Sequence, residues 1–167
     1  MMARILTQHG FADDVYQQHE GDFTPDLGRV LLPLAAYLAN RETLAGRNDV
    51  GVWLCADEEI EALETFINDI PVIALHFPAF TDGRSLSNAV IARKHYGYAG
   101  QIRAIGDVRL DILEQLHRCG FDAYDLAEDQ DVEHAAEHLK VFSHDYQTTL
   151  TTPGVIARRS AGDLTAE

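Results

Sequence analysis

From Val72 to Leu126 the chain reads VIALHFPAFTDGRSLSNAVIARKHYGYAGQIRAIGDVRLDILEQLHRCGFDAYDL, and the expected fold follows mainly from this segment. Short apolar runs, typical of buried strands, alternate in it with longer segments of helical periodicity. Glycines follow the helical segments, as is common at helix ends. The expected strands are 71–77, 101–105 and 123–126, and the expected helices between them are 85–96 and 108–119.

The same alternation extends in both directions along the chain. Upstream, we expect a helix at 33–45, a strand at 50–55, and a helix that follows the capping residue Asp57 and continues to Ile70. Downstream, we expect a last helix at 132–142. This spacing predicts an α/β fold with four consecutive β-α units and a mainly parallel sheet, preceded by an N-terminal segment and helix. The sheet is either an open doubly wound sheet or half of a (β/α) barrel.

The length of 167 residues fits one domain, which buries roughly 70% of its unfolded surface. We expect a single α/β domain at residues 1–147. Its first 28 residues are polar, with one strand-like run at 4–7. Periodicity is lost after residue 142, and residues 148–167 are expected to form a C-terminal tail that is flexible or docked on a partner.

The composition limits the classes of partner. Asp and Glu number 27 against 13 Lys and Arg, a net charge of −14, which argues against nucleic acid and anionic membranes. Between Arg84 and Arg118, however, six basic residues outnumber three acids. This positive segment is either a solvated set of helix charges or a local anion site. The sequence has no signal-like leader and no long apolar run, so we expect a cytoplasmic protein.

Two loops that follow expected strands carry acids. Ligands of open α/β sheets bind beyond the carboxyl ends of parallel strands, so both loops are candidates for a site. Asp82 lies in the first and Asp107 in the second, and each is a candidate general acid or base. The structural alternatives are a turn at Thr81-Asp82-Gly83 and a helix N-cap at Asp107. His76, at the end of a strand, is either a third catalytic candidate or a structural histidine.

Three arginines are candidate anion ligands. Arg84 lies beside an expected helix N-terminus, where free N–H groups attract anions; alternatively it forms a salt bridge to Asp82 or Asp107. Arg109 lies in the first turn of the next helix, where the dipole disfavours a cation and a compensating acid or anion is needed. Arg103 is flanked by apolar residues within a strand, so it points to the opposite face and needs a partner if buried.

No metal site is expected. His134, Glu137 and His138 form H-x-x-E-H, a spacing found in one class of zinc peptidases. The apolar stripe of this helix places both histidines on the solvent-facing side, and no third ligand is indicated. Cys55 and Cys119 are too few for an iron–sulfur cluster. No strand is followed by a G-x-G-x-x-G, P-loop or G-x-S-x-G motif, so the sequence leaves the cofactor unknown.

Several stretches together resemble the domain-of-unknown-function family 934. They are GVWL (51–54), PVIALHFPAFTDGR (71–84), HYGYAGQIRAIGDV (95–108), RCGFDAYDL (118–126) and FSHDYQ (142–147), and the likeness covers about residues 30–147. The positions that match the family pattern are Phe80, Asp82, Gly83, Arg84, Arg103, Gly106, Asp107, Arg118, Cys119, Gly120 and Phe121. The chain departs from the pattern after Arg84, where Ser-Leu-Ser replaces the usual Gly-Tyr-Ser.

Members of this family are described as probable oxidoreductases involved in sulfite reduction and are typically encoded beside assimilatory sulfite reductase. The resemblance therefore implies an accessory protein or oxidoreductase component of assimilatory sulfite reduction, which binds a small sulfur oxyanion or the sulfite reductase itself. Two alternatives stay open. One is an enzyme for an anionic metabolite, with Asp82 or Asp107 as acid–base and Arg84 as anion clamp. The other is a non-catalytic scaffold that forms homo-oligomers.

Overall fold

The computed structural model describes residues 4–130, 135–139 and 150. The strands are β1 (Arg4–Thr7), β2 (Gly10–Asp13), β3 (Gln17–Gln18), β4 (Val30–Pro33), β5 (Val50–Leu54), β6 (Val72–Phe77), β7 (Gln101–Gly106) and β8 (Ala123–Tyr124). The helices are α1 (Leu34–Ala39), α2 (Arg41–Leu44), α3 (Arg84–Lys94) and α4 (Leu113–Arg118). The described residues also contain the 3-10 segments η1 (Ile60–Leu63), η2 (Ile67–Asp69), η3 (Leu110–Ile112) and η4 (Ala135–Leu139).

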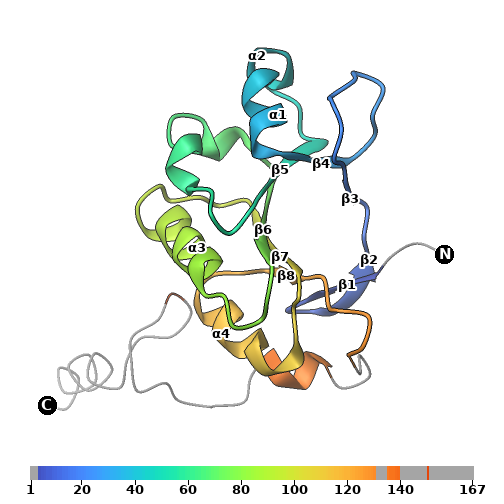
Figure 1. Ribbon diagram of the computed structural model, residues 1–167, viewed down its shortest axis with the longest axis vertical. Coiled ribbons are helices and arrows are strands. Elements are labelled where there is room, and N and C mark those ends of the chain that lie inside the picture. The colour runs from blue at the N-terminus through green and yellow to red at the C-terminus, as the bar shows by residue number, and fades with distance from the viewer. Residues whose placement is uncertain (1–3, 131–134, 140–149, 151–167) are drawn as a thin grey trace, which may run out of the picture.

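The eight strands in the described part of the chain belong to one sheet, in the order β2-β1-β8-β7-β6-β5-β4-β3. The helices lie along one side of this sheet, and the segment that joins β2 to β3 runs along the other side (Figure 1). From β3 to β8 every neighbouring pair is parallel, whereas β1 pairs antiparallel with both β2 and β8. The expected mixed α/β class is therefore present, with an antiparallel hairpin added to the parallel strands.

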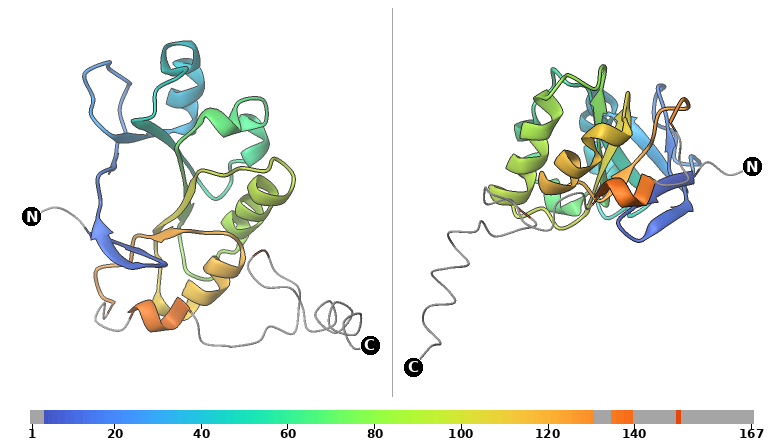
Figure 2. Two further views of the ribbon diagram at one scale, coloured as in Figure 1. Left: turned by 180° about the vertical axis from the view of Figure 1, so that it is seen from behind. Right: turned by 90° about the horizontal axis from the view of Figure 1, so that it is seen from below.

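The strand order distinguishes between the two expected architectures. From β3 to β8 the strands follow each other in chain order without a reversal, so right-handed crossovers all fall on the same side of the sheet. A doubly wound sheet needs a reversal, which places helices on both faces. The sheet is therefore a curled half barrel, with its helices on one side in both views of Figure 2.

The expected helices are only partly present. In place of one helix at 33–45, α1 and α2 are separated at Asn40, whose side-chain amide donates to the carbonyl of Ala36 at 2.9 Å. The prediction of a helix that follows Asp57 and continues to Ile70 is wrong, because the connection from β5 to β6 contains the two 3-10 turns η1 and η2. The expected 108–119 helix is a 3-10 turn followed by α4. Of the expected helix at 132–142, only the 3-10 segment η4 lies within the described residues.

Three strands were missed in the N-terminal part of the chain. The strand β4 is a short run of buried residues directly before α1, and its pairing with β5 extends the parallel sheet. The strands β2 and β3 consist of polar or partly exposed residues, so they carry no clear apolar alternation. Gly10, with a φ of +106°, begins β2 directly after the two-residue hairpin turn at Gln8 and His9.

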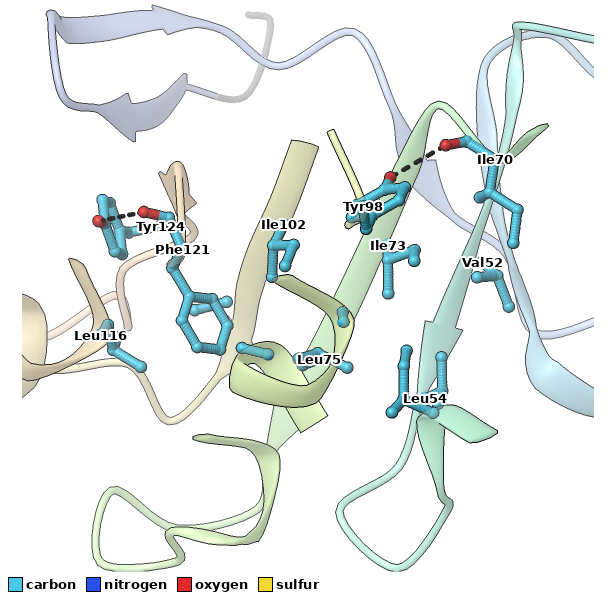
Figure 3. Packing of buried hydrophobic residues seen from close by; sticks show 14 of the residues in the cluster. Val52, Leu54, Ile70, Ile73, Leu75, Tyr98, Ile102, Leu116, Phe121 and Tyr124 are labelled. Carbon is cyan, nitrogen blue, oxygen red and sulfur yellow. Dashed lines mark hydrogen bonds between the residues drawn. The ribbon is translucent and has the colours of Figure 1, made fainter. Parts of the chain in front are cut away.

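The main hydrophobic core lies between the sheet and the helices. Alternate strand residues point to this side, such as Ile73 and Leu75 of β6 and Ile102 of β7 (Figure 3). The buried Tyr98 packs beside them, and its hydroxyl donates to the carbonyl of Ile70 at 3.0 Å. This bond satisfies a phenol that would otherwise be costly to bury.

The opposite side, here called the inner face, carries a smaller cluster. Its buried apolar members are Leu31, Val72, Ala74 and Ile105, with Tyr16 and Trp53 packed against them. Residues 14–16, which lead into β3, cross this face, where Tyr16 packs on the cluster and Asp14 binds Arg103. Among the described residues, no helix combines the length and apolar character needed to cross a lipid bilayer. The tail expected at 148–167 lies outside the described residues except for Leu150.

Candidate functional site

The loop after β6 contains a pair of opposite charges, Asp82 and Arg84. The Arg84 guanidinium donates to both carboxylate oxygens of Asp82, with Nε at 3.0 and 3.1 Å and Nη2 at 2.6 Å. The backbone N–H of Arg84 also donates to Asp82, at 3.2 Å. Hydrogen bonds from Arg84 hold the pKa of the Asp82 carboxyl below its usual value. The predicted alternatives of a turn at Asp82 and a salt bridge from Arg84 are both present.

The loop after β7 contains a second such pair, Asp107 and Arg109. Asp107 accepts from Arg109 Nε at 2.9 Å and from the backbone N–H of Phe80 at 3.0 Å, so its carboxylate joins the two loops. The predicted N-cap role of Asp107 is wrong. The 3-10 turn begins at Leu110, so its N-cap position is Arg109, and Asp107 lies two residues earlier and faces the neighbouring loop. The N–H of Leu110 donates to Gln130 Oε1 at 3.1 Å.

Phe80 connects these charged pairs. Its ring lies 5.3 Å from the guanidinium carbon of Arg109, and the residue is 45% exposed, unusual for a large apolar side chain. Arg109 also approaches Asp129 at 3.4 Å. The expected compensation for a cation near a helix start is thus supplied by Asp107 and Asp129.

Behind Phe80 a pocket of about 320 Å³ opens between α3 and α4. Its lining residues are Phe77, Phe80, Thr81, Asp82, Gly83, Leu86, Ile112, Gln115 and Leu116. Asp82 is the only predicted site residue among them and the only charged one. The pocket therefore has apolar walls and one ionised carboxylate at its border.

Arg103 lies apart from this pocket, on the inner face. As predicted, it points away from its apolar neighbours in β7, and its side chain is only 4% exposed. Its Nη1 donates to Asp14 at 2.7 Å and its Nη2 to Gln101 at 3.2 Å, while the ring of Tyr16 lies 5.6 Å from the guanidinium carbon. The Nε of Arg103 is buried without a hydrogen-bond partner.

Asp125 joins this second polar cluster on the inner face. Desolvation and the nearby charge of Asp14 raise the pKa of the Asp125 carboxyl, and Arg103 opposes the shift only in part. Sequence reasoning missed Asp14, Tyr16 and Asp125 as partners of Arg103. The one available signal was an arginine inside an apolar strand, which implies an acid nearby without saying which of the 27 it is.

His76 also belongs to the inner face. Its ring meets Trp53 edge to face, with centroids 6.3 Å apart, and its carbonyl accepts from the hydroxyl of Ser85 at 2.8 Å. Gly106, with a φ of +95°, passes so close that an added Cβ would lie 2.9 Å from the His76 ring. His76 is thus beside the turn that presents Asp107, but it does not line the pocket behind Phe80.

The positive segment predicted between Arg84 and Arg118 does not gather at one place. Arg93 points to the other end of the sheet, where it donates to the carbonyls of Tyr98, Gly100 and Gly120. Arg103 is buried, and its charge is neutralised by the ion pair with Asp14. The loops beyond the carboxyl ends of the parallel strands are left strongly acidic.

These loops are here called the acidic edge, which comprises residues 55–59, 78–84, 107–111 and 125–130. They hold nine Asp or Glu and two Arg, and both arginines are paired with aspartates. An anionic ligand would enter a region of negative potential, whereas a cationic ligand or partner would be attracted.

Metal-ligating residues are not grouped in the described part of the chain. No cluster of three or more His, Cys, Asp or Glu is arranged to hold a metal ion there. His134 of the H-x-x-E-H sequence lies outside the described residues. Burial raises the pKa of the free thiols of Cys55 and Cys119, which makes both poor thiolates.

The protein is a half-barrel α/β protein. The loops at the carboxyl ends of its parallel strands form an acidic surface with Phe80 at its centre. A family model described as "Bacterial protein of unknown function (DUF934)" matches residues 51–156, so the chain belongs to this family. The matched region includes β6, β7, β8 and both charged loops. The family predicted from the sequence is thereby confirmed, whereas the matched region begins at residue 51 and ends at residue 156 in place of the expected extent of about 30–147. A comparison with curated proteins finds no match.

Proposed function

We propose that the protein is an accessory component of assimilatory sulfite reduction that binds the sulfite reductase through its acidic edge. The pathway is suggested by the resemblance to a family described as involved in sulfite reduction. The choice of a protein partner over a small oxyanion rests on the charges of the edge. A docking surface tolerates paired charges and exposed aromatic side chains, which are frequent in protein interfaces.

The observation that carries the proposal is the pairing of the three candidate arginines. Arg84 is held by Asp82, Arg109 by Asp107 and Arg103 by Asp14. A sulfite or sulfate ion would have to displace Asp82 or Asp107 within the acidic edge, which already has an excess of negative charge, or Asp14 from Arg103 on the buried inner face. A basic protein surface gains from the same excess and needs no displacement.

Retention of the sulfite reductase haemoprotein on the immobilised full chain tests the proposal. We expect retention at low salt that weakens as the salt concentration rises, because exposed charges are screened. The double variant Glu59→Lys with Asp111→Lys reverses two exposed charges of the acidic edge and should weaken binding about tenfold. Glu42→Lys with Asp69→Lys makes the same change of net charge outside this edge and should have a smaller effect.

Two outcomes would overturn the proposal. One is a wild-type chain that fails to retain the reductase at low salt. The other is an increase in Tm with sulfite that is larger for the wild type than for Arg84→Ala, because ligand binding stabilises the native state and Arg84 would then be an anion ligand. Equal changes in Tm with sulfite for the wild type and Arg84→Ala agree with docking of a protein partner.

A further inference from the structure

We infer that the pocket behind Phe80 receives an apolar side chain from a basic segment of the partner, so that a hydrophobic anchor flanked by Lys or Arg is the chemistry this surface recognises. The inference rests on the proposed function, since it specifies how the partner binds at the acidic edge. It concerns the occupant of one pocket and can fail while the partner still binds elsewhere.

The exposed ring of Phe80 is held in place from two directions. Its backbone N–H is bound by Asp107, and Arg109 covers part of the ring. The ring therefore stays at the mouth of the pocket while 45% of the residue faces solvent. A large aromatic group held rigidly at the surface loses little conformational freedom on binding, a property of residues that dominate interface energies.

The walls of the pocket fit an apolar group of limited size. Phe77 and Leu116 are almost fully buried at its base, and Leu86 and Ile112 line its sides. A volume of about 320 Å³ is at the lower limit of small-molecule sites and suits one or two side chains. Filling it would cover the exposed face of Phe80 and remove apolar surface from water on both partners.

Charge complementarity indicates that the partner residues next to the apolar anchor are positively charged. Asp82 borders the pocket, and the acidic edge around it holds nine acids against two arginines. Positive side chains next to the anchor would lie against this excess, which favours encounter and fixes the direction of the segment. An acidic segment with the same anchor would be repelled.

Titration of the ¹⁵N-labelled full chain with short synthetic peptides tests the inference directly. The probe is acetyl-Lys-Lys-Leu-Lys-Lys-amide, and its two controls replace the leucine by serine or the four lysines by glutamates. We expect saturable shifts at Phe80, Leu86 and Ile112 with the probe, and at least severalfold weaker effects with each control. Equal shifts with the serine peptide, or shifts located elsewhere, would overturn the inference.

Matched variants of the protein separate the pocket from general folding. Phe80→Ala removes the aromatic ring at the mouth of the pocket, and Gln115→Trp fills the pocket. Each variant should weaken binding of the lysine–leucine peptide severalfold. Leu38→Ala removes another exposed apolar side chain, on α1, and should leave binding unchanged. Gln115 is exposed, so its replacement leaves the core intact even if Phe80→Ala proves unstable.

The sulfite reductase haemoprotein, used in parallel, distinguishes the two claims. If the wild type and both pocket variants retain the reductase equally, the inference of an apolar anchor in the pocket is overturned, while the proposed function stands. Peptide binding in the pocket without any retention of the reductase overturns the proposed function and leaves the anchor chemistry standing.

Discussion

The backbone N–H of Phe80 donates to the carboxylate of Asp107 at 3.0 Å, although the two residues are 27 positions apart. Because the same carboxylate binds Arg109, and Arg109 lies over the ring of Phe80, the three residues close a small network. This network joins the loops of two successive crossovers. It sets the position of the aromatic side chain at the centre of the acidic edge.

Removal of the Asp107 carboxylate should loosen this connection. In Asp107→Ala the Phe80 N–H and the Arg109 guanidinium lose their acceptor, and we expect a loss of about 1 kcal/mol in the free energy of unfolding. Amide hydrogen exchange at Phe80 should become faster. Asp107→Asn keeps one acceptor oxygen and should lose less. Unchanged exchange at Phe80 in the alanine variant would contradict the network.

The buried ion pair between Arg103 and Asp14 should be strongly coupled. Removing either partner leaves a buried charge uncompensated, so Asp14→Ala and Arg103→Met should each destabilise the protein by about 3–5 kcal/mol. The double variant should cost less than the sum of the two single changes. Denaturant unfolding of the four proteins measures this coupling, and strictly additive effects would show that the pair contributes nothing.

Asp125→Asn should stabilise the protein at neutral pH. The pKa of Asp125 is raised in the folded state, so ionisation of this carboxyl lowers the stability of the wild type as the pH rises through that pKa. Asparagine has no such penalty, and the advantage should vanish below the ordinary carboxyl pKa of 3.8, where both states are protonated. Tm values measured across this pH range test the sign. A variant that is less stable at pH 7 than the wild type would contradict it.

The Tyr98 hydroxyl should contribute mainly through its hydrogen bond to the carbonyl of Ile70, since its single proton can serve the carbonyl of Gln101 at 3.3 Å only as a weaker second branch. In Tyr98→Phe the Ile70 carbonyl loses its donor in a buried environment, and we expect a loss of about 1–3 kcal/mol. Tyr96→Phe, at a partly exposed tyrosine two positions earlier, should change stability by less than about 0.5 kcal/mol. Equal effects at the two positions, measured by chemical denaturation, would show that these bonds are unimportant.

Gly106 should tolerate a side chain less well than Gly97. Both have positive φ, so alanine at either position costs about 1–2 kcal/mol in backbone strain. Gly97 faces open space, whereas a Cβ on Gly106 would collide with the carbonyl oxygen of Phe77. Gly106→Ala should therefore cost at least about 1 kcal/mol more than Gly97→Ala. The same cost for both would show that the loops relax freely.

The parallel strands could be predicted because their signal is local. The runs at 50–55, 71–77 and 101–105 lie within one residue of β5, β6 and β7, and each is bounded by polar or turn-forming residues. The turn at Asp82 was predictable for the same reason, since the Asp82 carboxylate accepts from the backbone N–H of Arg84, only two positions away. The hairpin of β1 and β2 was missed because its second strand is largely exposed.

The connection between β5 and β6 shows where periodicity misleads. Ile60, Leu63, Ile67 and Ile70 have helical spacing, and all four are buried as a helix would require. Two 3-10 turns bury the same residues, because spacings of three and four fit separate short turns as well as one continuous helix. Only the packing against α3 and the sheet favours the two 3-10 turns over one continuous helix.

The α/β class, the positions of the central strands and the charged residues at their ends follow from local residue patterns. The half-barrel order and the partners of the charges depend on how the folded chain brings distant residues together. Arg103 finds Asp14 across 89 positions, and Phe80 finds Asp107 across 27, because electrostatic and hydrogen-bonding partners are selected by distance in space. Strand periodicity is a property of neighbouring residues, whereas these contacts exist only once the chain has folded.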